Sequence, residues 1–382
     1  MLKYEMKKVW QKRSNRFLMA VVIILSVVFS IFAIYSLRFV DKDGEEHSGI
    51  LAVRALVSDK NNWKGDVTAD LISDIVEKYK SGEVQSTYDI VYSVSEMLTG
   101  EKGDDYEAVI TTDSKNMKTI YQIYHDNLNK NCKIYGNTKE QEKFLNKKYQ
   151  EIDTPFYYEA ADSWDTMYLY ATTFSLVLVV IIGFMTAGIF DEEFRYHADS
   201  VFFSTKYGRS KAVCGKIAAG LFTATLIYGI GITLLSIISF SVMGTSGAFT
   251  AYQFYQPFSI YSVTCAGMYG IIILCGYVAS LLSASVTMFF TSIMRSMNVA
   301  VCIPFLLFVV SPFIGRALPF QTFFSLTPDQ LTNIMNCARI AYIYQIGGVV
   351  FRQIPFIIIF YTVISLSLLP FIYRNYHKKI LK

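Results

Sequence analysis

The chain has 382 residues and a formal net charge of +4; 53% of its residues are hydrophobic and 17% are charged. Soluble domains carry about 25% charged residues, so this composition excludes an ordinary soluble protein. We expect membrane lipid, and no nucleic acid, as a partner.

The first 37 residues combine a basic segment with an apolar one. Residues 1–16 are expected to form a cytoplasmic helix at the membrane interface, where Trp10, Arg13 and Arg16 meet lipid headgroups. Residues 17–37 are uncharged and reach the roughly 20 helical residues that cross a bilayer. The stretch is too long for the apolar part of a signal peptide, so a retained first span is predicted.

Residues 38–166 are polar and acidic. Between 41 and 166 there are 25 acidic and 15 basic residues, and this length suffices for a small folded domain. We expect a mainly helical extracellular domain with its first helix capped by Asp66 and its second ended by Gly100. Neither His47 nor His125 has a metal-ligand spacing, so no metal site is predicted. The expected helices cover about 66–79, 88–98, 117–128 and 140–149, with strands possible at 108–111 or 132–135.

The second half of the chain is dominated by apolar runs. Residues 217–294 contain no charged side chain, as lipid burial selects, because an ionised group at the bilayer centre costs about 3 kcal/mol. Pro304 and Pro312 predict a kink in one later span, and Gly183 and Gly276 are positions where helices can approach closely. The expected spans are 167–190, 217–242, 263–294, 296–315 and 353–373, with an extracellular turn at 243–262. The fold predicted is an all-α polytopic membrane protein with six transmembrane helices.

The segment 316–352 is expected to be extracellular or re-entrant. Thr327, followed by Pro328 and Gln330, predicts a helix start with Thr327 as its cap. This helix is expected to run to about residue 346 and to end at the two glycines that follow. An amphipathic helix resting on the outer leaflet is an equal alternative to a re-entrant one.

The basic residues set the orientation. Segments 1–16, 191–216 and 374–382, with Arg295, carry 16 basic and 5 acidic residues, and all fall on one side if six helices alternate. Both termini are therefore expected in the cytoplasm, with 38–166 outside a plasma membrane that we expect to be bacterial. Of six cysteines only Cys132 and Cys337 would then lie outside; free thiols are predicted, with a disulfide between these two as the alternative.

The sequence FDEEFRYHADSVFFSTKYGRSKAVCGK, at 190–216, joins the second and third spans. Three acidic residues come first, an amphipathic helix is expected over 194–203, and Tyr207-Gly208 breaks it. Lys211 and Lys216 are then expected to meet lipid headgroups. On these residues alone, an ordinary cytoplasmic loop with interfacial anchors is the simplest interpretation.

This segment resembles that of the ABC-2-type permeases, the membrane halves of ABC exporters with an ABCG-like fold. The six-helix layout, the basic N-terminus and the large loop after the first span are also similar. The chain departs from the family pattern at 197–200, where a small pair is usual, and at 207, where proline is common. The matching positions are Phe190, Glu193, the helix 194–203, Ser204, Tyr207, Arg209, Gly215 and Lys216.

The resemblance implies a coupling helix that docks on a separate ATPase subunit. It also implies a second permease subunit, identical or related, and no cofactor on this chain, since ATP and Mg²⁺ bind the partner. In agreement, the sequence has no phosphate-binding loop: the spacing from Gly208 to Gly215-Lys216 is wrong, and Ile217 replaces the required hydroxyl. The residues implied in the ATPase contact are Glu192, Glu193, Phe194, Arg195, Phe202, Phe203, Ser204 and Arg209.

The function implied is the permease subunit of an ATP-driven ABC exporter for an amphipathic or lipidic substrate, such as an antimicrobial peptide. The predicted span interiors contain no Asp, Glu, Lys, Arg or His, which argues against ion coupling. The alternative is a peptide-sensing or immunity module whose extracellular domain captures a peptide without transport. No nucleophile–base pair or metal-ligand pattern supports an enzyme, so no catalytic residue is expected.

Overall fold

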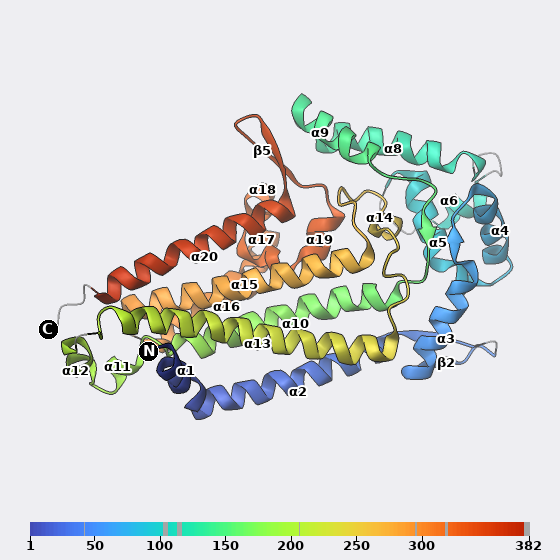
Figure 1. The fold of residues 1–382 in the computed structure, drawn as a ribbon. Helices are drawn as coiled ribbons and strands as arrows, with labels where there is room; N and C mark the ends of the chain where they lie inside the picture. The colour runs from blue at the N-terminus through green and yellow to red at the C-terminus, as the bar shows by residue number, and fades with distance from the viewer. Residues whose placement is uncertain are drawn as a thin grey trace.

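The computed structural model describes residues 1–41, 43–101, 106–112, 117–205, 207–294, 296–317 and 320–377. Within these ranges, six helical segments are long and apolar enough to cross a membrane, and they lie side by side in one bundle (Figure 1). The chain is therefore an all-α polytopic membrane protein, as predicted. The six are α2 (Arg13–Ser36), α10 (Asp162–Ala187), α13 (Lys211–Met243), α15 (Cys265–Met294), a fifth span (Met297–Gly315) and α20 (Gln353–His377).

The central helices of the bundle are α10 and α15. α15 packs against α10, α13 and α20, while α13 packs against α2. Two glycines allow the helices to approach closely. A Cβ on Gly276 would lie 2.4 Å from the Tyr228 hydroxyl, and a Cβ on Gly183 would lie 2.9 Å from Cγ of Pro304. Both glycines predicted to mark close helix contacts do so.

The fifth span is irregular in its middle. It consists of α16 (Met297–Phe305), a π-helical turn η2 (Leu306–Val310) and α17 (Ser311–Ala317). The π-helical turn lies between Pro304 and Pro312, the two residues from which a kink was predicted. Each proline removes a backbone donor from the helix, and such wider turns are one way to accommodate that loss.

The segment between α2 and α10 folds into a domain of helices, one short hairpin and one further antiparallel strand pair at one end of the bundle (Figure 1). The hairpin pairs β1 (Arg38–Val40) with β2 (Glu46–Ser48). β3 (Gly65–Asp66) pairs antiparallel with β4 (Tyr157–Tyr158), which comes from the far end of the segment. The helices are α3 (Ile50–Lys60), η1 (Asn61–Trp63), α4 (Ala69–Lys80), α5 (Val84–Thr99), α6 (Tyr106–Thr111), α8 (Ile120–Tyr135) and α9 (Lys139–Gln150).

Local signals in this domain were partly correct. Gly100 ends α5 in the left-handed conformation, at φ 74°, as predicted. Asp66 does not cap α4, because it is paired in β3; the Thr68 hydroxyl accepts from the Leu71 amide instead. The alternative strands at 108–111 and 132–135 are wrong, since both segments are helical.

The loop between α13 and α15 fastens this domain to the bundle. It contains the short helix α14 (Tyr252–Tyr255). The Tyr124 hydroxyl donates to the carbonyl of Pro257 at 2.6 Å, and the Ser93 hydroxyl donates to the carbonyl of Phe254 at 2.6 Å. The turn predicted at 243–262 is therefore a packed part of the domain interface rather than a simple connection.

The segment before α20 differs from the prediction. It forms α18 (Gln321–Phe324), η3 (Pro328–Thr332), α19 (Ile334–Arg339) and a hairpin of β5 (Ile343–Ile346) with β6 (Val349–Arg352). A helix continuing to residue 346 is wrong. Thr327 makes no side-chain cap, and its hydroxyl donates to the carbonyl of Phe324. Gly347 and Gly348, both with positive φ, form the hairpin turn.

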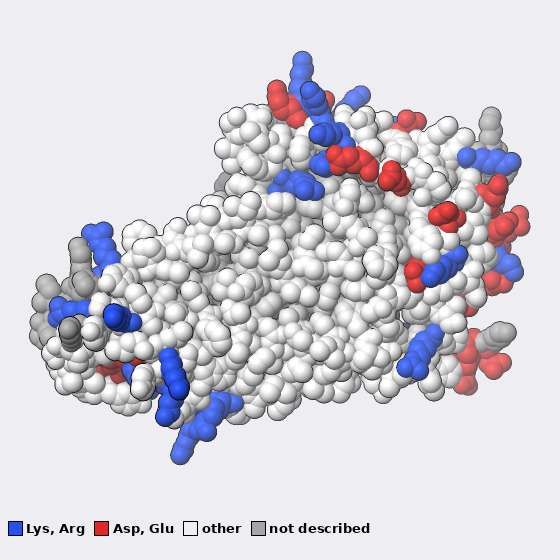
Figure 2. All heavy atoms as spheres, in the orientation of Figure 1, with Lys and Arg blue, Asp and Glu red and all other residues white. Residues whose placement is uncertain are grey.

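Charged residues gather at the two ends of the bundle. The N-terminus, the α10–α13 segment and the end of α20 lie at one end, opposite the domain (Figure 1). On the face shown in Figure 2, an uncharged surface separates basic side chains at the first end from the acidic ones on the domain. Five of the basic residues counted above for the first end lie outside the described residues: Lys206, Arg295, Lys378, Lys379 and Lys382. All six cysteines lie in described segments and are unpaired, so the free-thiol prediction is confirmed.

Candidate functional site

The segment between α10 and α13 forms two short helices rather than one. α11 (Glu192–Arg195) and α12 (Asp199–Ser204) are separated by a break where His197 adopts φ 52°. The continuous helix predicted over 194–203 is therefore wrong. The break lets Phe194 and Phe203 pack with ring centroids 6.2 Å apart, whereas nine residues of continuous helix would separate them by about 13.5 Å.

Lys216 lies at the centre of a buried ion network. Its side chain has no solvent exposure, and its ammonium lies 2.7 Å from Oε1 of Glu193 and 3.3 Å from Oε2 of Glu5. It also donates to the carbonyl of Ile189 at 2.9 Å. A buried charge is tolerated only when it is paired and hydrogen-bonded. Lys216 therefore joins α13 to α11 and to the N-terminal helix α1 (Leu2–Gln11).

Glu193 is the acidic counterpart of Lys216. Its second carboxylate oxygen accepts from the Tyr376 hydroxyl at 3.0 Å, and the Lys8 ammonium lies 3.7 Å from its first. Burial alone would raise the pKa of Glu193, but the charge and hydrogen bond of Lys216, with Lys8 and Tyr376, hold that pKa below its usual value. Glu193 is thus a charged residue whose partners come from α1, α13 and α20.

A second ion pair fixes α1 against the same segment. The Lys12 ammonium lies 2.9 Å from Oε1 of Glu192 and donates to the carbonyl of Gly188 at 3.1 Å. Lys12 is also where the chain turns from α1 into α2. The first span is therefore connected to the α10–α13 segment through a short, ion-paired contact.

Aromatic rings surround the end of α20 beside the ion network. The Tyr376 ring has centroid distances of 5.0 Å to Phe190, 5.2 Å to Phe203, 6.0 Å to Phe194 and 6.2 Å to Phe202. The four phenylalanines come from the turn after α10 and from both short helices. They shield the network from water, which strengthens its electrostatic interactions.

The eight residues implied in an ATPase contact divide into two groups. Glu193 and Phe203 are buried in the network and the aromatic cluster, so a chain docking on this surface would not touch them directly. Arg195 donates to the Tyr196 hydroxyl, and Arg209 to the carbonyl of Phe203. The exposed or half-buried members are Glu192, Phe194, Arg195, Phe202, Ser204 and Arg209.

One of the five predicted interface anchors is wrong. Lys216 cannot meet lipid headgroups, because its ammonium is enclosed by Glu5 and Glu193. The other four stay predictions. Arg13, Arg16 and Lys211 are exposed and Trp10 is half-buried against the core.

Sequence reasoning missed the partners of this network. Glu5 carried a usable signal, because it is the single acidic residue among six basic ones in the first sixteen positions. An isolated acid of that kind indicates an ion pair. Tyr376 carried no such signal, since only the packing of α20 brings it to Glu193.

A separate buried ion cluster lies at the opposite end of the bundle. The Lys60 ammonium lies 2.8 Å from Asp89 and 2.5 Å from Asp162, and the Tyr158 hydroxyl donates to Asp89 at 3.2 Å. Burial alone would lower the pKa of Lys60, but the two carboxylates raise it well above its usual value. The cluster ties α3 and α5 of the domain to the start of α10, a structural role.

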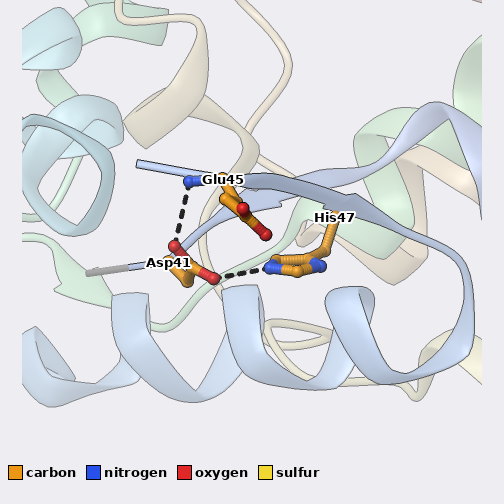
Figure 3. Close-up of side chains that lie close together, drawn as sticks. All are labelled: Asp41, Glu45 and His47. Carbon is orange, nitrogen blue, oxygen red and sulfur yellow. Dashed lines mark hydrogen bonds and ion pairs between the residues drawn. The ribbon is translucent and has the colours of Figure 1, made fainter. Parts of the chain in front are cut away.

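One group in the described residues has the composition of a metal site. Asp41, Glu45 and His47 place their ligand atoms within 4.8 Å of one another beside the β1–β2 hairpin (Figure 3). Asp41, however, is already engaged: it accepts from the Glu45 amide at 2.9 Å and lies 2.6 Å from Nε2 of His47. These hydrogen bonds stabilise the β1–β2 hairpin, which explains the cluster without a metal ion.

Comparison with known proteins gives no assignment. No family model, no curated protein and no solved structure matches the chain. Function must therefore be argued from the network, its surroundings and the membrane-spanning fold.

Proposed function

We propose that the chain is the membrane-spanning permease subunit of an ATP-driven ABC exporter. The observation that carries this proposal is the network in which Glu193 of a short surface helix contacts α1, α13 and α20 through Lys8, Lys216 and Tyr376. Glu5 of α1 is the second carboxylate on Lys216. A partner that moves α11 acts on three spans at once, because α1 continues into α2. The side of the bundle that carries the network faces the cytoplasm in this proposal, and 38–166 faces outward.

The strength of the buried ion pairs means that a movement of α11 is passed on to the spans it contacts. Separating a buried, hydrogen-bonded ion pair costs about 3–5 kcal/mol. A displacement of α11 therefore shifts its partners rather than breaking the contact between Lys216 and Glu193. Surface ion pairs, worth at most about 1 kcal/mol, would yield instead.

The outer surface of the segment offers a place for a partner to dock. Tyr196 and Val201 are each 68% exposed. They border a hollow of about 480 Å³ that is also lined by Lys8, Glu192 and Thr205. Exposed aromatic and aliphatic side chains beside charged ones are typical of protein interfaces. An ATPase seated here would push on α11 and α12 directly.

The remaining parts of the proposal come from the resemblance to the ABC-2-type permeases. The ATPase binds ATP and Mg²⁺, and a second permease subunit, identical or related, completes the path for an amphipathic or lipidic substrate. This chain contributes no catalytic group.

Cross-linking tests the docking surface. A Val201→Cys variant in a Cys214→Ser/Cys302→Ser background removes the two exposed native thiols and places one reactive group on α12. We expect it to capture an ATP-binding chain in intact cells. Phe249→Cys, on a residue 85% exposed in the loop at the other end of the bundle, is the matched control and should capture none.

Two results would overturn the proposal. One is a full chain that purifies from native membranes without an ATPase while Val201→Cys captures no nucleotide-binding chain. The other is an associated ATPase whose ATP turnover is unaffected by Tyr196→Ala combined with Val201→Ala. If instead a peptide is retained by 38–166 in the absence of any ATPase, the sensing or immunity function replaces transport.

A further inference from the structure

An apolar groove of about 490 Å³ lies where α20 begins. Its walls come from three elements: Phe144 of α9, Val350 and Phe351 of β6, and the first three turns of α20. Elements far apart in the sequence therefore form one continuous surface, so the groove is not simply the exposed side of a single helix.

The α20 wall of the groove is aromatic and open. Phe356 and Phe360 stack with ring centroids 5.8 Å apart and an interplanar angle of 12°, and Phe351 lies 6.1 Å from Phe356. Ile359 and Val363 are 65% and 55% exposed. An apolar surface of this kind on a membrane-spanning helix is covered by hydrocarbon, not by water.

The position and length of the groove match one leaflet of a bilayer. Its polar end is Arg352, the residue before α20 starts at Gln353. From Arg352 to Val363 the helix rises by about 16 Å. Half of a hydrocarbon core of about 30 Å is about 15 Å. A chain lying in the groove would therefore run from the headgroup level to near the bilayer centre.

The rim at the headgroup level is basic. Arg352 and Lys148 both line the groove, and the Arg352 guanidinium lies 5.3 Å from the centroid of the Tyr261 ring. One carboxylate is present, Glu151, 2.6 Å from the Lys148 ammonium. The hydrogen bond from Lys148 lowers the pKa of Glu151, with further contributions from Lys147 and Arg352. Three cations thus lie near this one anion, and Figure 2 shows basic side chains, with acidic ones beside them, over α9 and the adjoining end of α20.

We infer that this groove binds an anionic phospholipid, with one acyl chain along Phe356, Phe360 and Val363 and its phosphate held by Arg352 and Lys148. The bound lipid fills the space between α9 and α20, so it connects the domain to the sixth span. The inference is independent of ATP and of any partner subunit.

Native mass spectrometry of the full chain in detergent tests the site. Phosphatidylglycerol is titrated against phosphatidylcholine with the same acyl chains. The double variant Arg352→Gln/Lys148→Gln should raise the apparent dissociation constant of phosphatidylglycerol by about tenfold, and that of phosphatidylcholine by much less, because choline already balances the charge of its phosphate. The matched control is Lys139→Gln/Lys143→Gln, on the same helix α9 but outside the groove.

The apolar part has its own pair of variants. Ile359→Trp fills the groove and should weaken binding of both lipids, whereas Leu366→Trp, 58% exposed on α20 but outside the groove, should not. The inference fails if wild-type chain shows no preference for phosphatidylglycerol, or if the control variants have the same effect as the groove variants. It also fails if Ile359→Trp instead disrupts a dimer, since a second copy would then cover the groove.

Discussion

The Lys216 ammonium lies 2.7 Å from Glu193, and the side chain of Lys216 has no exposed surface at all. This contact joins a third-span residue to a four-residue helix that has little stability of its own. Tertiary contacts must therefore hold α11 in place. Among the described residues, the ion network and the aromatic rings around Tyr376 provide those contacts.

Loss of the buried cation should destabilise the protein strongly. Lys216→Met removes the buried cation that Glu5 and Glu193 share and leaves them only the half-exposed Lys8, 3.0 Å from Glu5 and 3.7 Å from Glu193. We expect the free energy of unfolding to fall by about 3–5 kcal/mol. Unfolding of the purified chain in detergent, followed by intrinsic fluorescence against temperature, measures this. Lys211→Met is the control, because Lys211 is exposed and its ammonium lies 4.8 Å from the centroid of the Tyr207 ring; its loss should cost less than about 1 kcal/mol. Equal effects of the two variants would contradict the burial argument.

Close packing of α15 gives a second prediction. Gly276→Ala places a methyl group 2.4 Å from the Tyr228 hydroxyl and 2.6 Å from Oγ of Ser175, and overpacking of this kind costs about 1–3 kcal/mol. Gly270→Ala, two turns earlier in the same helix, meets nothing within 4 Å and should be neutral or slightly stabilising, since alanine favours helix. The two melting temperatures measured side by side decide the matter: a Gly270→Ala variant as unstable as Gly276→Ala would rule out the contact.

The membrane-spanning fold was predictable because lipid imposes a composition. A run without charges over 217–294 leaves no other arrangement than two spans and a turn. The first and last residues of the helices were less predictable, because a helix can continue beyond its apolar run into charged residues. α13, for example, begins at Lys211 rather than at 217.

The site was less predictable because its partners come from distant parts of the chain. Lys216 follows a basic cluster, and such a residue before a span is typical of a headgroup anchor. Only the packing of α1 against α13 brings Glu5 to it. The hairpin at 343–352 is a different case: the sequence IYQIGGVVFR has two glycines between β-branched and aromatic residues, which is a hairpin signal that was interpreted as a helix end.

The domain-side ion cluster yields a third prediction. Lys60→Met removes the cation that Asp89 and Asp162 share, and unfolding of the chain should become easier by about 3–5 kcal/mol. Its control is Lys64→Met, which removes an exposed lysine from its ion pair with Glu159 and should have a much smaller effect, because solvent screens this pair. Thermal unfolding of the two variants gives the comparison.

The pH dependence of that cluster follows from the direction of the Lys60 shift. Because the folded-state pKa of Lys60 is raised, its contribution is complete below the unfolded value of about 10.4 and is lost only as the pH rises through the folded value. The stability difference between wild type and Lys60→Met should therefore be the same at about pH 7 and pH 9. A difference that disappears at the higher pH would show that the lysine is not held charged by the two aspartates.

The β1–β2 hairpin should respond to pH through His47 and Asp41. The hydrogen bond to Asp41 raises the pKa of His47, and the same bond lowers the pKa of Asp41. The histidine contribution is complete below its unfolded value of about 6.5 and is lost as the pH rises through the folded value; the aspartate contribution is complete above about 3.9 and is lost as the pH falls through the folded value. The pair therefore stabilises the hairpin most between about pH 4 and pH 6.5.

Hydrogen exchange measures this window directly. After correction for intrinsic exchange rates, the amides of 38–48 should be better protected at about pH 5.5 than at about pH 8.5, because His47 has then lost its proton. Asp41→Asn removes the partner and should abolish the difference while leaving exchange in α10 unchanged. Protection that is equal at both pH values in the wild-type chain would mean that the backbone pairing of β1 with β2, and not the His47–Asp41 contact, sets the stability of this hairpin.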